Sequence, residues 1–114
     1  MVAHEEELKA IVHAYAKLDA AYLDRTARRM EQNPGLPGGD DLMADEFSPF
    51  LTCDTAHRDL ALLASAMAQH AARGTANLKR IVNQEQADYD WSHTTCVRRL
   101  AMPPTAAWAD YQAE

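Results

Sequence analysis

Two cysteines in this chain each have a histidine one helical turn away. Cys53 is followed by His57, and His93 is followed by Cys96. Residues three or four positions apart lie on the same side of a helix, so each pair can present a thiolate and an imidazole in one direction. Two such pairs supply the four ligands of a tetrahedral zinc site. The spacing therefore raises the hypothesis of a zinc-stabilised helical domain with Cys53, His57, His93 and Cys96 as ligands.

The same residues also have an interpretation without metal. Cysteine behaves as a small apolar side chain in many protein cores, and the histidines can lie on the surface. Two cysteines are too few for a disulfide framework, and in a cytoplasmic protein they would stay reduced. The separation between His57 and His93 also matches no common zinc motif. We therefore predict no cofactor, with zinc as the alternative.

Aspartate–histidine pairs are the residues closest to a catalytic arrangement. Asp54 precedes His57 by three positions, and Asp90 precedes His93 by three. A carboxylate can orient an imidazole that acts as a general base. An aspartate at this spacing is equally typical of a helix cap, in which it accepts backbone N–H groups. The chain has no glycine-rich phosphate loop, no Gly-x-Ser-x-Gly and no His-Glu-x-x-His, so we predict no catalytic residues and no enzymatic activity.

The segment from Trp91 to Leu100 resembles the recognition helix of helix-turn-helix repressors. The resemblance implies a DNA-binding regulator in which serine opens the helix, histidine and threonine face base edges and two arginines bind phosphates. The residues concerned are Ser92, His93, Thr94, Arg98 and Arg99.

The residues before this segment depart from that family. Glu85, Gln86 and Asp90 stand where the family has an apolar residue, an alanine and a glycine-containing turn. The formal net charge of −6 also opposes binding to a phosphate backbone. DNA binding therefore remains an alternative, and nucleic acid is not the partner that we expect.

The composition indicates that helices must position all of these residues. The chain is rich in alanine and has only 4 Gly and 5 Pro among 114 residues, and no run alternates apolar and polar residues as a strand does. We predict an all-α fold, a small bundle of three to five helices in a single domain spanning 1–114. The expected elements are a long helix 4–32, a loop 33–52, helices 54–73, 75–89 and 91–101, and a short segment 105–113. A continuous helix across Gly74 remains open as an alternative.

The first 32 residues carry the clearest periodic pattern. Large apolar side chains recur there at steps of three and four, with no proline or glycine in between. This spacing is typical of a helix that packs along another helix. A helix over 4–32 would be ~40 Å long, which is more than a domain of this size can cover. We therefore predict a partner-binding face made of Leu8, Ile11, Tyr15, Leu18 and Tyr22.

These observations together favour a non-catalytic protein–protein interaction module. We expect a small accessory, adaptor or structural subunit of a larger assembly that self-associates or docks through its first helix. No apolar stretch is long enough for a membrane span, and no secretion signal is evident, so we expect a cytoplasmic protein without membrane contact. The abundance of alanine and arginine suggests a bacterial or phage source.

Overall fold

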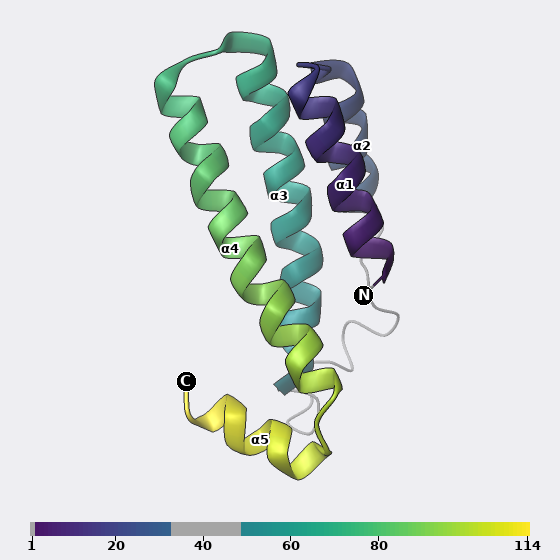
Figure 1. Ribbon diagram of the computed structural model, residues 1–114, viewed down its shortest axis with the longest axis vertical. Coiled ribbons are helices and arrows are strands. Elements are labelled where there is room, and N and C mark those ends of the chain that lie inside the picture. The colour runs from purple at the N-terminus through teal and green to yellow at the C-terminus, as the bar shows by residue number, and fades with distance from the viewer. Residues whose placement is uncertain (1, 33–48) are drawn as a thin grey trace.

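The computed structural model describes residues 2–32 and 49–114 and confirms a small all-α bundle. Within these ranges the chain forms five helices and no strand. The first four helices lie side by side and alternate in direction, and the fifth crosses one end of the bundle (Figure 1). The helices are α1 Val2–Ala16, α2 Ala20–Gln32, α3 Leu51–Arg73, α4 Ala76–Leu100 and α5 Pro104–Gln112.

The predicted single helix over 4–32 is wrong, because the chain reverses direction between α1 and α2. Leu18 has a φ of 56°, a left-handed conformation that ends α1. The carboxylate of Asp19 then accepts a hydrogen bond from the backbone N–H of Tyr22 at 3.1 Å, as the cap of α2. The two helices form an antiparallel hairpin (Figure 1). Leucine tolerates the left-handed region poorly, so no residue type at the turn marked the break in the sequence.

This turn changes which residues of the second half face the core. A continuous helix would have placed Arg25 and Arg29 on the buried stripe, whereas both are exposed. The helix that restarts at Ala20 instead turns a different set inward, namely Leu23, Thr26, Ala27 and Met30. The break therefore replaces a stripe that ends in two arginines with one that can pack against α3.

Helix α3 forms the centre of the bundle. Its most extensive contacts are with α4 and α2, and α1 touches it more lightly. Its buried face combines large side chains with alanines, which allow neighbouring helices to approach closely. The core residues of α3 include Leu60, Leu63, Ala64 and Met67, each with at most 3% of its surface exposed.

The chain breaks between α3 and α4 at Gly74, which settles the alternative that the sequence left open. Gly74 has a φ of 66° and its N–H donates to the carbonyl of His70 at 2.7 Å, which closes α3. The hydroxyl of Thr75 then accepts a hydrogen bond from the N–H of Leu78 at 3.1 Å and caps α4. Both residues do what their types predict.

The predicted boundary between helices 75–89 and 91–101 is wrong, because α4 runs through Trp91 without interruption. Asp90 accepts a hydrogen bond from Gln86 at 2.9 Å along the helix surface, and does not serve as a cap. The last helix begins at Pro104, not at Thr105, since proline suits the first turn of a helix. Of the predicted loop 33–52, residues 33–48 lie outside the described part, while 51 and 52 already belong to α3.

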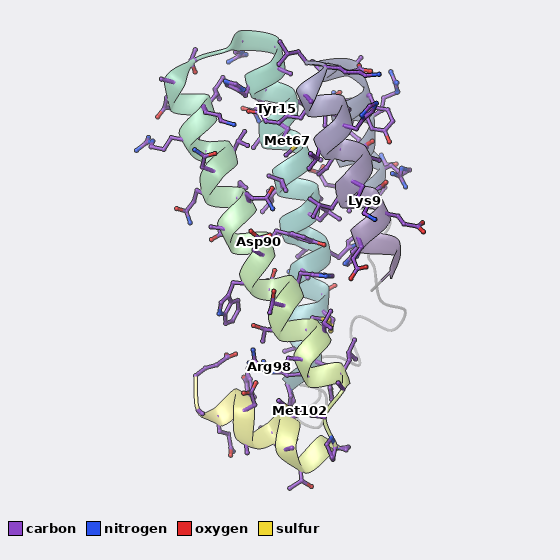
Figure 2. The ribbon with its side chains drawn as sticks, in the orientation of Figure 1. Lys9, Tyr15, Met67, Asp90, Arg98 and Met102 are labelled. Atoms are coloured by element: carbon purple, nitrogen blue, oxygen red, sulfur yellow. A yellow bond between two sulfur atoms is a disulfide. The ribbon has the colours of Figure 1, made fainter. Side chains whose placement is uncertain are left out.

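A buried arginine holds α5 against the end of the bundle. Arg99 has 0% of its surface exposed and donates to the carboxylate of Asp110 at 2.9 Å and to the carbonyl of Pro49 at 3.2 Å. It also pairs with Glu114, while the exposed Arg98 donates to Asp110 at 2.7 Å (Figure 2). Burial opposes the charge of Arg99, but its hydrogen bonds to the two carboxylates outweigh burial and raise its pKa. The guanidinium therefore stays charged inside the protein.

None of the described helices combines the length and the apolar character that crossing a membrane requires.

Candidate functional site

The two cysteines of the predicted zinc site are joined to each other. Cys53 in α3 and Cys96 in α4 form a disulfide, with their Cα atoms 4.8 Å apart. The expectation of reduced thiols is wrong, and so is the predicted ligand set with His57 and His93, because both thiolates are consumed in the bond. The two cysteines are 43 residues apart in the sequence, and they meet only because α3 and α4 lie antiparallel. The spacing of residues within one helix does not reveal that alignment.

The two histidines of that prediction each lie near a third, His4. Nε2 of His4 in α1 lies 3.1 Å from Nδ1 of His57 in α3. The ring of His4 also lies 6.5 Å from the ring of His93 in α4, centroid to centroid. We name these three residues the histidine cluster. Sequence reasoning missed His4, because it belongs to no pair at ligand spacing and only the packing of α1 brings it here.

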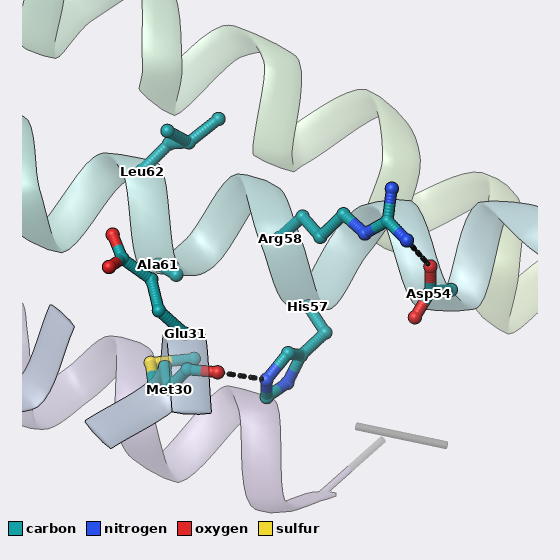
Figure 3. Close-up of a pocket in the computed structure, with 7 residues that line it drawn as sticks. All are labelled: Met30, Glu31, Asp54, His57, Arg58, Ala61 and Leu62. Atoms are coloured by element: carbon teal, nitrogen blue, oxygen red, sulfur yellow. Dashed lines mark hydrogen bonds and ion pairs between the residues drawn. The ribbon is translucent and has the colours of Figure 1, made fainter. Parts of the chain in front are cut away.

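The direction of the hydrogen bonds in the histidine cluster follows from one backbone carbonyl. Nε2 of His57 lies 3.0 Å from the carbonyl oxygen of Met30, which can only accept (Figure 3). In neutral His57, Nδ1 is then the acceptor, and Nε2–H of His4 donates to it. Nδ1 of His4 is left with a lone pair, and it is buried without a partner among the described residues. Nδ1 of His93 is also buried without a hydrogen-bond partner among the described residues.

The surroundings of the histidine cluster oppose positive charge on His4. Burial, and then the neighbouring His57 and His93, lower the pKa of His4 from 6.5 to about 4, although Glu7 opposes this shift. His4 is therefore neutral near pH 7. On the other side of the cluster, the carboxylate of Glu5 lies 3.7 Å from Nε2 of His93.

A buried tyrosine forms one wall of the histidine cluster. The ring of Tyr89 stacks on His93 at a centroid distance of 5.2 Å, and only 1% of the residue is exposed. Burial, and then Glu5 and Asp90, raise the pKa of Tyr89 to about 12. Its hydroxyl therefore keeps its proton, and it has no hydrogen-bond partner in the described part of the chain. The described residues include no group of three His, Cys, Asp or Glu side chains arranged to hold a metal ion.

His57 also lines a pocket of the described surface, which lies between α2 and α3 (Figure 3). The pocket has a volume of about 460 Å³. Apolar atoms dominate its lining, and an ion pair between Arg58 and Asp54 at 2.9 Å lies beside it. The lining residues are Met30, Glu31, Asp54, His57, Arg58, Ala61 and Leu62. We name this feature the α2–α3 pocket.

The partner-binding face predicted for the first helix is largely used inside the chain. Ile11 is fully buried, and Leu8, Tyr15 and Tyr22 pack partly buried against the core. Leu18 is 60% exposed, but it lies in the turn between α1 and α2. These five side chains therefore do not form one free surface.

Tyr15 shows how one residue of that face is held. Its hydroxyl lies 2.7 Å from Nδ1 of His70 in α3 and accepts a hydrogen bond from Lys79 in α4 at 3.2 Å (Figure 2). One tyrosine thus joins three helices near the closed end of the α3–α4 hairpin. The hydroxyl finds its partners within the chain, and not in a second molecule.

The residues of the helix-turn-helix prediction do not form one accessible surface. The hydroxyl of Ser92 is buried and donates to Asp59 at 2.7 Å, so this serine caps no helix. His93 belongs to the histidine cluster, and Arg99 is enclosed by carboxylates. Only Thr94 and Arg98 are exposed. The phosphate contact predicted for Arg99 and the capping predicted for Ser92 are therefore wrong.

The aspartate–histidine pairs are not joined in the described structure. Asp54 pairs with Arg58 and Asp90 accepts from Gln86, so neither carboxylate orients the histidine that follows it. Comparisons with protein-family models, with curated proteins and with solved structures found no match to this chain.

Proposed function

We propose that this chain is a non-catalytic protein–protein interaction module and a structural subunit of a larger assembly. The α2–α3 pocket is the observation that carries the proposal. Its volume of about 460 Å³ lies in the range of sites that enclose a ligand or a large side chain. An apolar floor with charged groups at the rim is the arrangement in which interface anchor residues dock.

The occupant that we propose is a large apolar side chain of a second copy of this chain. Trp91 is 55% exposed on α4, and tryptophan is enriched among the residues that dominate binding energy. The chain therefore carries both halves of such a contact. The pocket lies between α2 and α3 and Trp91 lies on α4, so the contact joins two different surfaces of the chain. Such a contact closes a dimer when both copies reciprocate it and builds rings or filaments when they do not.

The α2–α3 pocket replaces the first helix as the proposed docking site. Burial of Ile11 within the monomer makes its use in an interface costly, since the core would have to open. Leu62, in contrast, is 49% exposed at the pocket and is free to contact a partner without any change in the core.

The disulfide also bears on where the protein acts. Disulfides persist in oxidising compartments and are rare in the cytoplasm, so Cys53–Cys96 supports an oxidising compartment over the cytoplasm that the sequence suggested. Mass spectrometry of protein that is alkylated at harvest from its natural source tests this. We expect no alkylated cysteine, and alkylation of both thiols would contradict the proposal.

Sedimentation velocity over a range of protein concentrations tests the proposed self-association. We expect the wild type to assemble as its concentration rises, and Leu62→Glu to remain monomeric because a charge at the pocket must be desolvated. Trp91→Ala should weaken assembly as well. Val12→Glu is the matched control, since Val12 is similarly exposed, at 46%, but lies on α1 away from the pocket. A monomeric wild type, or equal effects of Leu62→Glu and Val12→Glu, would contradict the proposal.

A further inference from the structure

The histidine cluster and the adjacent Tyr89 contain all of the buried side-chain polar atoms that lack a hydrogen-bond partner in the described part of the chain. They are Nδ1 of His4, Nδ1 of His93 and the hydroxyl of Tyr89. Buried polar atoms without partners are costly, and native proteins retain few of them. The three atoms lie where the first turns of α1 meet α3 and α4. The contact that holds α1 in place therefore contains buried polar atoms without hydrogen-bond partners.

Protonation would weaken the hydrogen-bonded contact that joins His4 to His57. Nδ1 of His57 is the acceptor for Nε2–H of His4 at 3.1 Å. A proton on that Nδ1 turns it into a donor, so Nε2 of His4 must accept and the proton of the neutral His4 ring moves to Nδ1, which is buried without an acceptor among the described residues. A proton on Nδ1 of His4 instead places a charge in a buried position without an acceptor. Each route opposes the contact between α1 and α3.

The carboxylates around the histidine cluster are poorly placed to compensate for that charge. On α1, Glu5 lies near His93 and has 59% of its side chain exposed, while Glu7 pairs with Arg29 of α2. On α3, Asp54 pairs with Arg58. On α4, Asp90 accepts from Gln86 and the Tyr89 hydroxyl stays protonated. Among the described residues, Glu5 can therefore stabilise one imidazolium, at His93, and Glu31 of α2 lines the same pocket as His57, while no described carboxylate pairs with His4.

We propose that the histidine cluster is an acid-sensitive latch: protonation in mild acid weakens the contact between His4 and His57 and shifts the amino-terminal end of α1 towards release from α3 and α4. The hairpin of α3 and α4 remains folded, because the Cys53–Cys96 disulfide closes its open end next to the cluster.

The direction of the pH effect follows from the protons bound in each state. The pKa of His4 is about 4 while α1 is docked, and its ordinary value is 6.5. Released α1 therefore binds more protons between these values, so docking weakens as the pH falls from 6.5 towards 4. At pH 5.5 the docking equilibrium constant falls by about tenfold from its value in mild alkali, and by less to the extent that solvent reaches His4.

Hydrogen–deuterium exchange of the full chain at pH 7.5 and pH 5.5 tests the latch, with rates corrected for the intrinsic effect of pH. We expect the amides of α1 to lose protection at pH 5.5 while those of α3 and α4 keep theirs. Unchanged protection of α1 would overturn the proposal, and so would an equal loss in α3 and α4, which indicates general acid unfolding.

Matched variants assign the effect to the histidine cluster. His4→Gln retains a donor for Nδ1 of His57 but cannot take up a proton, so α1 should stay protected at pH 5.5. His13→Gln removes an exposed histidine of the same helix and should behave as the wild type. His57→Gln provides a second test should His4→Gln weaken α1 at neutral pH. The proposal would be overturned if α1 lost protection between pH 7.5 and pH 5.5 in both His4→Gln and His57→Gln to the same extent as in the wild type.

Discussion

Replacing Arg99 with methionine should destabilise the protein far more than the same change at its neighbour Arg98. Both arginines donate to Asp110, at 2.9 Å and 2.7 Å, so they share a partner and a position in α4. They differ in burial, because Arg99 has 0% of its side chain exposed and Arg98 has 47%. Methionine preserves most of the apolar stem of arginine. Comparing the two variants therefore isolates the contribution of a buried guanidinium to stability.

The expected magnitude follows from the contacts that are lost. Removing one member of a fully buried ion pair costs about 3–5 kcal/mol. The carboxylate partners here keep 27% and 37% of their side chains exposed, so water can replace part of the interaction. The carbonyl of Pro49 also loses its donor. We therefore expect Arg99→Met to lower the free energy of unfolding by about 2–3 kcal/mol, and Arg98→Met by less than about 1 kcal/mol.

Urea denaturation followed by circular dichroism measures both values, and limited proteolysis shows whether α5 detaches. Arg99→Met should lower the urea midpoint and expose α5 to cleavage, whereas Arg98→Met should change neither by much. Equal midpoints for the two variants would refute the reasoning that the buried guanidinium holds α5.

Three further predictions concern the disulfide and the first hairpin. The Cys53→Ser, Cys96→Ser double variant should lose at most about 4 kcal/mol of unfolding free energy, the loop-entropy value for a separation of 43 residues, and calorimetry of the two forms measures it. Ile11→Ala should cost about 2–4 kcal/mol in urea titrations because Ile11 is fully buried, and a cost under about 0.5 kcal/mol would contradict its place in the core. Leu18→Gly should raise the melting temperature, since glycine relieves about 1 kcal/mol of strain at a φ of 56°, and a lower melting temperature would count against a turn there.

Local signals allowed correct predictions where the neighbouring residues decide the structure. The break at Gly74 and Thr75 follows from residue types that act within a few positions. The all-α fold was predicted from helix propensity, which is also a property of individual residues and their neighbours. The turn at Leu18 could not be predicted in this way. Asp19 is the only residue there that favours the start of a helix, and the residues on both sides favour a continuous helix.

The candidate site depends on contacts between distant segments, which the sequence does not reveal directly. Cys53 meets Cys96 and His4 meets His57 only after α1, α3 and α4 take their relative positions. The cysteine–histidine pairs singled out positions 57 and 93, and both histidines lie near His4. The pairs could not indicate that the cysteines bond to each other, because spacing within one helix does not show which residues meet across two helices.

A proton NMR titration of the His4 ring tests most directly whether burial in the histidine cluster governs the attachment of α1. The signal is assigned by its disappearance in His4→Gln, and its chemical shift is followed from pH 8 to pH 3.5. The structure predicts a midpoint well below the ordinary value of 6.5, near pH 4 while α1 stays docked and closer to 6.5 as release of α1 becomes populated. A midpoint at 6.5 or above would show that His4 is solvated or paired with an acid, and would contradict the account.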